Sequence, residues 1–181
     1  TLFPYTTLFR SLMLRTMPRD LFASLAFDLK LGDQRTMDEM AEKLKSIDPV
    51  RGADLAKNLE RGLIAIPLVA HEALSTAYIN DVDGLGVFAQ QLFGFGRPGD
   101  VFLGISTSGN SKNVMSATVV ARALGIKVIG LTGEKGGELA KVADVSIKVP
   151  ETETYMIQEL HLPVYHCLCL MLEDRIFGAA E

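Results

Sequence analysis

Short, wholly apolar runs alternate with longer stretches of helical periodicity along the second half of the chain. Three such runs predict buried strands, at residues 100–105, 127–131 and 145–149. Apolar residues three and four apart predict the intervening and flanking helices, at residues 87–95, 112–124, 137–142 and 152–177. Strands that alternate with helices of this length form parallel sheets with right-handed crossovers. The pattern therefore predicts an α/β fold with helices flanking the sheet.

The first half of the chain is mostly helical in pattern. Residues 36–47 form an amphipathic stretch that Thr36 can cap, and a second helix begins at Pro49 behind Asp48 and runs to Gly62. A helical pattern also covers residues 20–31. The apolar run at residues 63–70 predicts a further buried strand, and a helix comes next over residues 73–79. We therefore divide the chain into a helical segment, 12–62, and an α/β core, 63–177.

The strand at residues 100–105 breaks abruptly into the polar turn STSGNS before the next helix begins. Four hydroxyl groups lie in this turn, on Ser106, Thr107, Ser108 and Ser111. A helix N-terminus presents unpaired N–H groups and the positive end of the helix dipole, so this arrangement suits a phosphate monoester. The turn has no lysine and no P-loop spacing, which argues against nucleoside triphosphate hydrolysis. The alternative is an ordinary serine or asparagine helix cap.

Composition and charge exclude several other classes of function. The net charge of −4 offers no basic surface for nucleic acid, and no apolar run approaches the ~20 residues that a membrane span needs. Cys167 and Cys169 are two apart on a predicted helix, where their side chains diverge and cannot form a disulfide. We therefore expect reduced thiols and a cytoplasmic protein.

Candidate polar residues lie at two further places. His71 comes after the apolar run at 63–70, and the pair Asn80-Asp81 precedes a turn; capping and turn formation alone would explain all three. In the last helix, spacings of three, seven and eight from Gln158 bring His161, Tyr165 and His166 toward one side, although packing is an alternative for both histidines. The glycine-containing turn at 133–137 is interpreted as a connector between the second strand and the next helix.

The segment GISTSGNSKNV resembles the second phosphate loop of the sugar isomerase (SIS) domain, and within that superfamily it is most similar to the phosphoheptose isomerases. The segments LTGEKGGELAKVADVSIKVP and ETETYMIQELHLPVYHCLCLMLED are similar to the rest of that domain in order and spacing, so the resemblance covers approximately residues 62–177. It implies a three-layer, doubly wound, Rossmann-like α/β SIS domain.

The resemblance also implies roles for particular residues. The serines and threonine of the loop bind the phosphate, Asn80, Asp81 and Gln158 contact the sugar phosphate, and His166 acts as acid and base. In some members of the family Gln158 and His166 have zinc-ligating counterparts, together with a histidine and a glutamate from elsewhere. The implied activity is conversion of sedoheptulose 7-phosphate to an aldose heptose 7-phosphate for surface polysaccharide, by a homotetramer.

The family's first strand, its GNGGS loop and its glutamate-bearing helix have no counterpart in this sequence. Residues 1–11 share no period with the rest of the chain and are interpreted as non-native sequence. We therefore expect a fragment that binds ligand but turns it over slowly or not at all. An alternative is a non-catalytic SIS module that binds a sugar phosphate or a protein such as the replication initiator, although such relatives lack a histidine at the position of His166. An amino-sugar phosphate isomerase or an etherase is a third, less favoured hypothesis.

Overall fold

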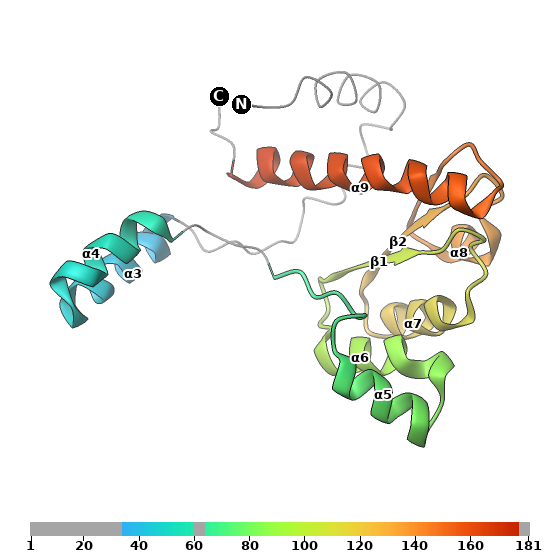
Figure 1. The fold of residues 1–181 in the computed structure, drawn as a ribbon, viewed down its shortest axis with the longest axis horizontal. Coiled ribbons are helices and arrows are strands. Elements are labelled where there is room, and N and C mark those ends of the chain that lie inside the picture. Colours follow the sequence, from blue (N-terminus) through green and yellow to red (C-terminus); the bar gives the residue numbers. More distant parts are fainter. Residues whose placement is uncertain (1–33, 60–63, 178–181) are drawn as a thin grey trace. The chain divides into compact units, whose positions relative to one another are not determined.

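The computed structural model describes residues 34–59 and 64–177 of the chain, coloured in Figure 1. The chain divides into two compact units, one formed by Lys30–Ile66 and one that contains Pro67–Glu181. The helix expected at residues 20–31 and the segment 1–11 lie outside the described residues.

The described residues of the first unit form two helices, α3 (Gln34–Ile47) and α4 (Pro49–Asn58), that pack against each other. Asp48 caps α4 as predicted, because its carboxylate accepts hydrogen bonds from the N–H groups of Val50 (3.1 Å) and Arg51 (2.9 Å). The expected cap at Thr36 is wrong. The helix already begins at Gln34, since glutamine and arginine are good helix formers, so Thr36 lies inside it. The second helix ends at Asn58 instead of Gly62 because Leu59 is extended.

The second unit is built on a parallel sheet of three strands, β1 (Val101–Ile105), β2 (Lys127–Thr132) and β3 (Val145–Lys148). The strands lie in the order β1-β2-β3, and the register pairs Phe102 with Val128 and Ile129 with Val145. All three strands were predicted from their apolar runs, and their parallel pairing confirms the predicted α/β fold class.

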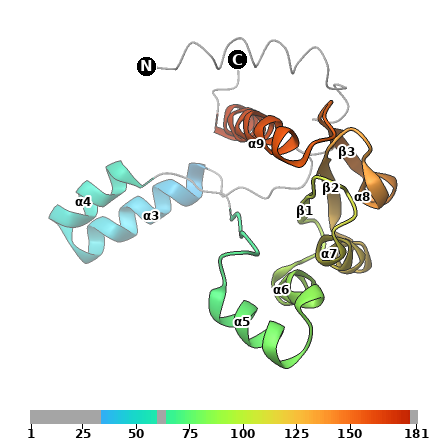
Figure 2. The ribbon, with the colours of Figure 1, turned by 45° about the vertical axis from the view of Figure 1, so that its right-hand side comes forward.

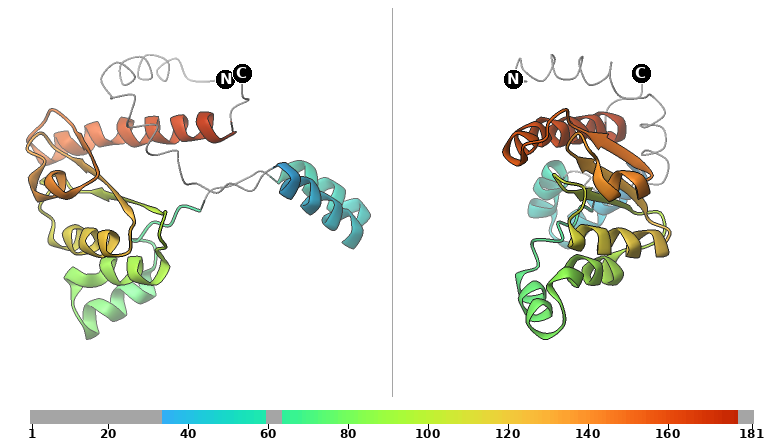
Figure 3. Two further views of the ribbon diagram at one scale, coloured as in Figure 1. Left: turned by 180° about the vertical axis from the view of Figure 1, so that it is seen from behind. Right: turned by 90° about the vertical axis from the view of Figure 1, so that its right-hand side faces the viewer.

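Helices cover both faces of this sheet. The described helices of this unit are α5 (Glu72–Asp81), the 3₁₀ turn η1 (Gly84–Gly86), α6 (Val87–Phe95), α7 (Lys112–Ala123), α8 (Gly137–Val142) and α9 (Thr154–Phe177). Figures 1 and 2 show α9 on one face and α7 on the other, with α6 and α5 beyond α7, and the view from behind in Figure 3 agrees. None of the described helices is long and apolar enough to cross a membrane.

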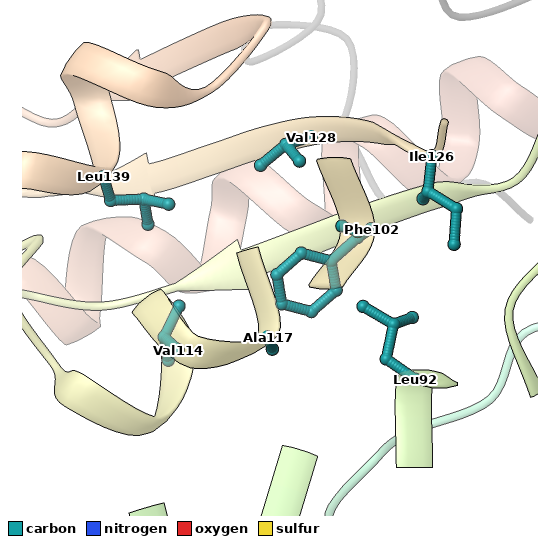
Figure 4. Close-up of a cluster of buried hydrophobic side chains, with 8 residues drawn as sticks. Leu92, Phe102, Val114, Ala117, Ile126, Val128 and Leu139 are labelled. Carbon is teal, nitrogen blue, oxygen red and sulfur yellow. The ribbon is translucent and has the colours of Figure 1, made fainter. Parts of the chain in front are cut away.

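Each face of the sheet has its own apolar core. On the α7 side, Phe102 and Val128 of the strands meet Leu92 of α6, Ala117 of α7 and Leu139 of α8, as Figure 4 shows. The other core lies under α9 and joins apolar side chains of that helix to those of the sheet: Ile129, Leu131, Ile147, Val149, Ile157 and Val164. Burial of these side chains holds the carboxyl ends of the strands and the starts of α7 and α9 in one layered arrangement.

The predicted strand at residues 63–70 is wrong. Its described part, residues 64–70, forms no strand; Ile64 is 91% exposed, and the N–H of Ala70 closes a turn on the carbonyl of Pro67 (3.0 Å). Proline has no N–H to donate to a ladder, so the run is interrupted at the point where a strand would need that bond. His71 is then the N-cap residue of the next helix, which begins at Glu72.

Candidate functional site

Residues 106–111 form a turn at the carboxyl end of the sheet, between β1 and α7. The N–H of Ser106 donates to the carbonyl of Leu131 (3.0 Å), and the N–H of Gly133 donates to the carbonyl of Thr107 (3.0 Å), so the turn is fastened to the strand beside it. A further bond from the N–H of Gly109 to the carbonyl of Ser106 (3.1 Å) closes the turn itself. In doubly wound sheets this edge is where ligands bind.

Two of the predicted hydroxyl groups face each other across the turn. The hydroxyl oxygens of Ser106 and Ser111 are 2.8 Å apart, and Ser106 is only 4% exposed. Ser111 occupies the N-cap position of α7, but its side chain makes no capping bond to the helix. The alternative of an ordinary serine cap therefore does not describe Ser111. The Oδ1 atom of Asn113 accepts from the N–H of Val114 (2.9 Å), and the N–H groups of Lys112 and Asn113 are left to another acceptor.

In the turn and at the start of α7, four backbone N–H groups have no hydrogen-bond partner within the part of the chain that the structure describes. They belong to Thr107, Ser108, Lys112 and Asn113, on either side of the hydroxyl pair. Unpaired N–H groups at the start of a twelve-residue helix, together with the positive end of its dipole, favour an anion with several acceptor oxygens. The turn can therefore bind a phosphate group without any lysine of its own.

Gly109 allows the turn to approach α8 closely. Its φ of +67° lies in the left-handed region, and a Cβ atom there would collide with the carbonyl of Gly136 just before α8. Asn110, beside it, hydrogen-bonds to the N–H of Glu138 in the first turn of α8. Sequence patterns contain no signal for that contact, because the two residues are 28 positions apart.

The residues predicted near α5 have mainly local partners. The Nδ1 atom of His71 accepts from the N–H of Leu74 (3.4 Å) and its ring stacks on that of Phe95, so His71 caps and packs. Asn80 and Asp81 lie in the last turn of α5, where the amide of Asn80 donates to the carboxylate of Asp81 (2.8 Å). Both side chains are exposed, and their contact with a sugar stays a prediction.

The polar residues of α9 are divided between two faces of the helix. His161 is 3% exposed, lies between the core positions Ile157 and Val164, and has no hydrogen-bond partner for Nε2 among the described residues. Gln158 and His166 are exposed instead. The expected grouping on one side therefore does not include His161, because its place in the helix repeat is that of the core residues.

Zinc ligation by Gln158 and His166 does not follow from the described residues. Both lie on α9, eight positions apart, which is about 12 Å along a helix axis. The described residues contain no cluster of three or more histidine, cysteine, aspartate or glutamate side chains that could hold a metal. Two residues are fewer than the about three protein ligands of a catalytic zinc, so zinc ligation by Gln158 and His166 stays a prediction and we derive no chemistry from it.

Comparisons with known proteins find relatives of this chain. The SIS domain model matches residues 49–133. A phosphoheptose isomerase from Geotalea daltonii is 48% identical over 118 residues, which cover 65% of this chain and 62% of that protein. Another, from Chromohalobacter salexigens, is 38% identical over 135 residues, which cover 71% of this chain and 68% of that protein. The chain belongs to the phosphoheptose isomerase family.

Solved structures extend the likeness to the fold. A phosphoheptose isomerase from Francisella tularensis superposes with a TM-score of 0.61 at 37% identity, covering 64% of this chain and 62% of that one. One from Neisseria gonorrhoeae gives a TM-score of 0.56 at 34% identity, covering 76% and 72%. The chain spans less than two thirds of the length of several curated relatives, 62% of the Geotalea protein and 58% of the one from Sulfurimonas denitrificans.

Proposed function

We propose that this chain binds a sugar phosphate at residues 106–111 and acts in the isomerisation of sedoheptulose 7-phosphate to D-glycero-D-manno-heptose 7-phosphate. The observation that carries the proposal is the set of unpaired N–H groups at the start of α7, beside hydroxyls that do not cap the helix. Membership of the phosphoheptose isomerase family supports the choice of a heptose phosphate as ligand.

In this proposal the phosphate lies against the turn, and its oxygens accept hydrogen bonds from the free N–H groups and from the hydroxyls of Ser106, Thr107, Ser108 and Ser111. Charge-assisted bonds of this kind contribute about 1.5–3 kcal/mol each. Asn80, Asp81 and Gln158 are proposed to contact the sugar. Their exposed side chains are available for such contacts.

His166 is proposed as the group that moves protons between the carbon and oxygen atoms of the sugar. A ketose becomes an aldose when a base removes a proton from C1 while the C2 oxygen gains one, which gives a 1,2-enediol; return of a proton to C2 and loss of one from the C1 oxygen complete the change. An imidazole is suited to both directions of transfer near neutral pH. His166 is exposed on α9 and its ring meets the Tyr165 ring edge-on, with centroids 5.2 Å apart.

A homotetramer is proposed for the assembled protein. Apolar side chains remain exposed on α9, at Tyr155, Met156, Leu162 and Leu170, so this helix has apolar surface that its own sheet does not cover. Light scattering at micromolar concentration should give four times the mass of the chain, and a monomer would contradict the proposed assembly.

The test of ligand binding compares two serine-to-alanine variants. Ser108 lies in the turn, whereas Ser116 lies on α7 and donates its hydroxyl proton to the carbonyl of Lys112 (3.0 Å). Calorimetry with sedoheptulose 7-phosphate should show that Ser108→Ala weakens binding at least about tenfold, from the loss of one charge-assisted bond. Ser116→Ala should bind as the unsubstituted chain does.

The same titrations with sedoheptulose, which has no phosphate, complete the test. Neither substitution should change affinity for the unphosphorylated sugar, because the turn is assigned to the phosphate alone. Equal losses for both ligands in Ser108→Ala, or no binding of sedoheptulose 7-phosphate by the unsubstituted chain, would contradict the proposed function.

A further inference from the structure

Asn110 joins the turn at residues 106–111 to α8 through both ends of its carboxamide. Its Oδ1 atom accepts a hydrogen bond from the N–H of Glu138 (3.0 Å), and its Nδ2 donates to the carbonyl of Ser108 (3.1 Å). Its backbone N–H donates to the Ser108 hydroxyl oxygen (3.1 Å). One side chain therefore fixes the backbone of the turn and a helix that comes after β2.

A second bond runs in parallel with this one. The carbonyl of Gly109 accepts from the N–H of Leu139 (2.9 Å), so two consecutive N–H groups at the start of α8 are satisfied by the turn. The N-cap residue of α8, Gly136, has no side chain to do this, and a helix of six residues has little stability by itself. The start of α8 and the shape of the turn therefore depend on each other.

The link leaves the ligand-binding groups free. Asn110 uses its amide on Ser108 and Glu138, while the N–H groups of Thr107, Ser108 and Lys112 stay unpaired within the described chain. A phosphate can accept from several N–H groups at once only when the backbone that carries them is ordered. If the loop becomes ordered at the moment of binding, the conformational entropy that it loses is subtracted from the affinity.

We propose that Asn110 is a positioning residue, which holds the turn in its phosphate-binding conformation by tying it to the start of α8. The inference rests on the proposed function, since it presumes that the turn binds phosphate. It assigns Asn110 a role through the backbone, without contact between its own side chain and the ligand. The turn at 133–137, expected to be a connector, becomes part of the support of the site.

The matched control is Asp144, at the amino ends of the strands. Its carboxylate accepts from the N–H of Val128 (2.8 Å) and from Lys127 Nζ (3.0 Å), so Asp144→Ala also removes a side chain that binds a distant backbone N–H. Sedoheptulose 7-phosphate affinity should fall about tenfold in Asn110→Ala, which corresponds to about 1.4 kcal/mol, and change by less than twofold in Asp144→Ala.

A second measurement uses the unsubstituted chain and does not depend on the folding of a variant. If the bond to Glu138 favours the ligand-binding turn, the ligand must strengthen that bond by the same factor, because coupling between two equilibria is reciprocal. Saturating sedoheptulose 7-phosphate should therefore slow hydrogen exchange at the Glu138 amide by about tenfold. The Val128 amide, bound by Asp144, is the reference for the stabilisation that ligand binding gives to the whole unit.

The outcomes separate this inference from the proposed function. If the unsubstituted chain fails to bind sedoheptulose 7-phosphate, the proposed function is wrong and the inference falls with it. If that chain binds, three results would overturn the inference alone. The affinity of Asn110→Ala for sedoheptulose 7-phosphate could lie within twofold of that of the unsubstituted chain, or Asp144→Ala could lose as much affinity as Asn110→Ala. The third is a hydrogen exchange rate at the Glu138 amide that the ligand does not change.

Discussion

Replacing Gly109 by alanine should destabilise the α/β unit through two separate effects. The first is the backbone conformation, because a left-handed φ of +67° costs an alanine about 1–2 kcal/mol that glycine does not lose. The second is overlap of the new Cβ with the carbonyl of Gly136. Relieving the overlap must move the turn away from α8 and weaken the bond from Leu139 to Gly109, which adds about 1–3 kcal/mol for a backbone group left unpaired.

Gly125 provides the matched control for the first effect alone. It has a similar φ of +73° in the turn after α7, but nothing lies within 4 Å of the Cβ that an alanine would add. Gly125→Ala should therefore lower the free energy of unfolding by about 1–2 kcal/mol, and Gly109→Ala by about 2–5 kcal/mol. At about 4 °C per kcal/mol for a domain of this size, the two melting temperatures should differ by about 4–12 °C.

Urea unfolding followed by circular dichroism measures both free energies, and equal m-values show that the variants expose similar surface on unfolding. Calorimetry on the folded proteins adds an independent result, since sedoheptulose 7-phosphate should bind Gly125→Ala normally and Gly109→Ala more weakly. If Gly109→Ala were no more destabilising than Gly125→Ala, the close packing of the turn on α8 would be refuted.

Three other regions of the chain give further predictions. Burial would raise the pKa of Asp144, but hydrogen bonds from Val128 and Lys127 and the lysine charge outweigh it and hold the pKa below its ordinary value. The ionised carboxylate therefore contributes about 1 kcal/mol of stability at this partly exposed site, which is present at neutral pH and lost as the pH falls below about 4. In Asp144→Asn, the free energy of unfolding measured with urea should depend less on pH over that range. In a chain extended by the family's GNGGS loop and glutamate-bearing helix, His166→Gln should keep sedoheptulose 7-phosphate affinity while lowering turnover by at least about a hundredfold in an isomerase assay, and unchanged turnover would leave His166 as a surface residue. Gly52→Ala should reduce the helical signal of the first unit on heating, because its Cβ would collide with the backbone of α3; an unchanged melting profile would contradict that packing.

The strands of the sheet could be predicted from sequence because each is a short apolar run between polar turns. The same rule failed for residues 63–70, where apolar content alone does not say whether a partner strand is available and Pro67 removes one donor. The start of a helix can likewise be predicted only where the local signal is strong. Asp48 was recognised because aspartate before proline is a strong local signal, whereas Thr36 was not a cap because helix formation extended past it.

Part of the site could be predicted from neighbouring residues in the sequence, and part depends on contacts between residues that are distant in the sequence. The hydroxyls of the turn and the helix behind them are contiguous in sequence, so their juxtaposition could be predicted. The bond from Glu138 to Asn110 joins residues 28 positions apart and has no periodic signature. His161 was grouped with Gln158 from spacing alone, and only the burial of one face of α9 separates them, because a helical repeat does not say which side meets the sheet.

Within the described chain, the hydrogen bonds that shape the turn at residues 106–111 come from β1, α7, β2, α8 and their connections. Ser106 binds to Leu131, Thr107 to Gly133, and the Gly109–Asn110 pair to the start of α8. The turn is therefore supported by one contiguous stretch of sequence. For protein engineering, residues 101–142 could therefore be grafted as one block into another parallel sheet. Grafting the six turn residues alone would leave behind their hydrogen-bond partners on β2, on the connection after it and at the start of α8.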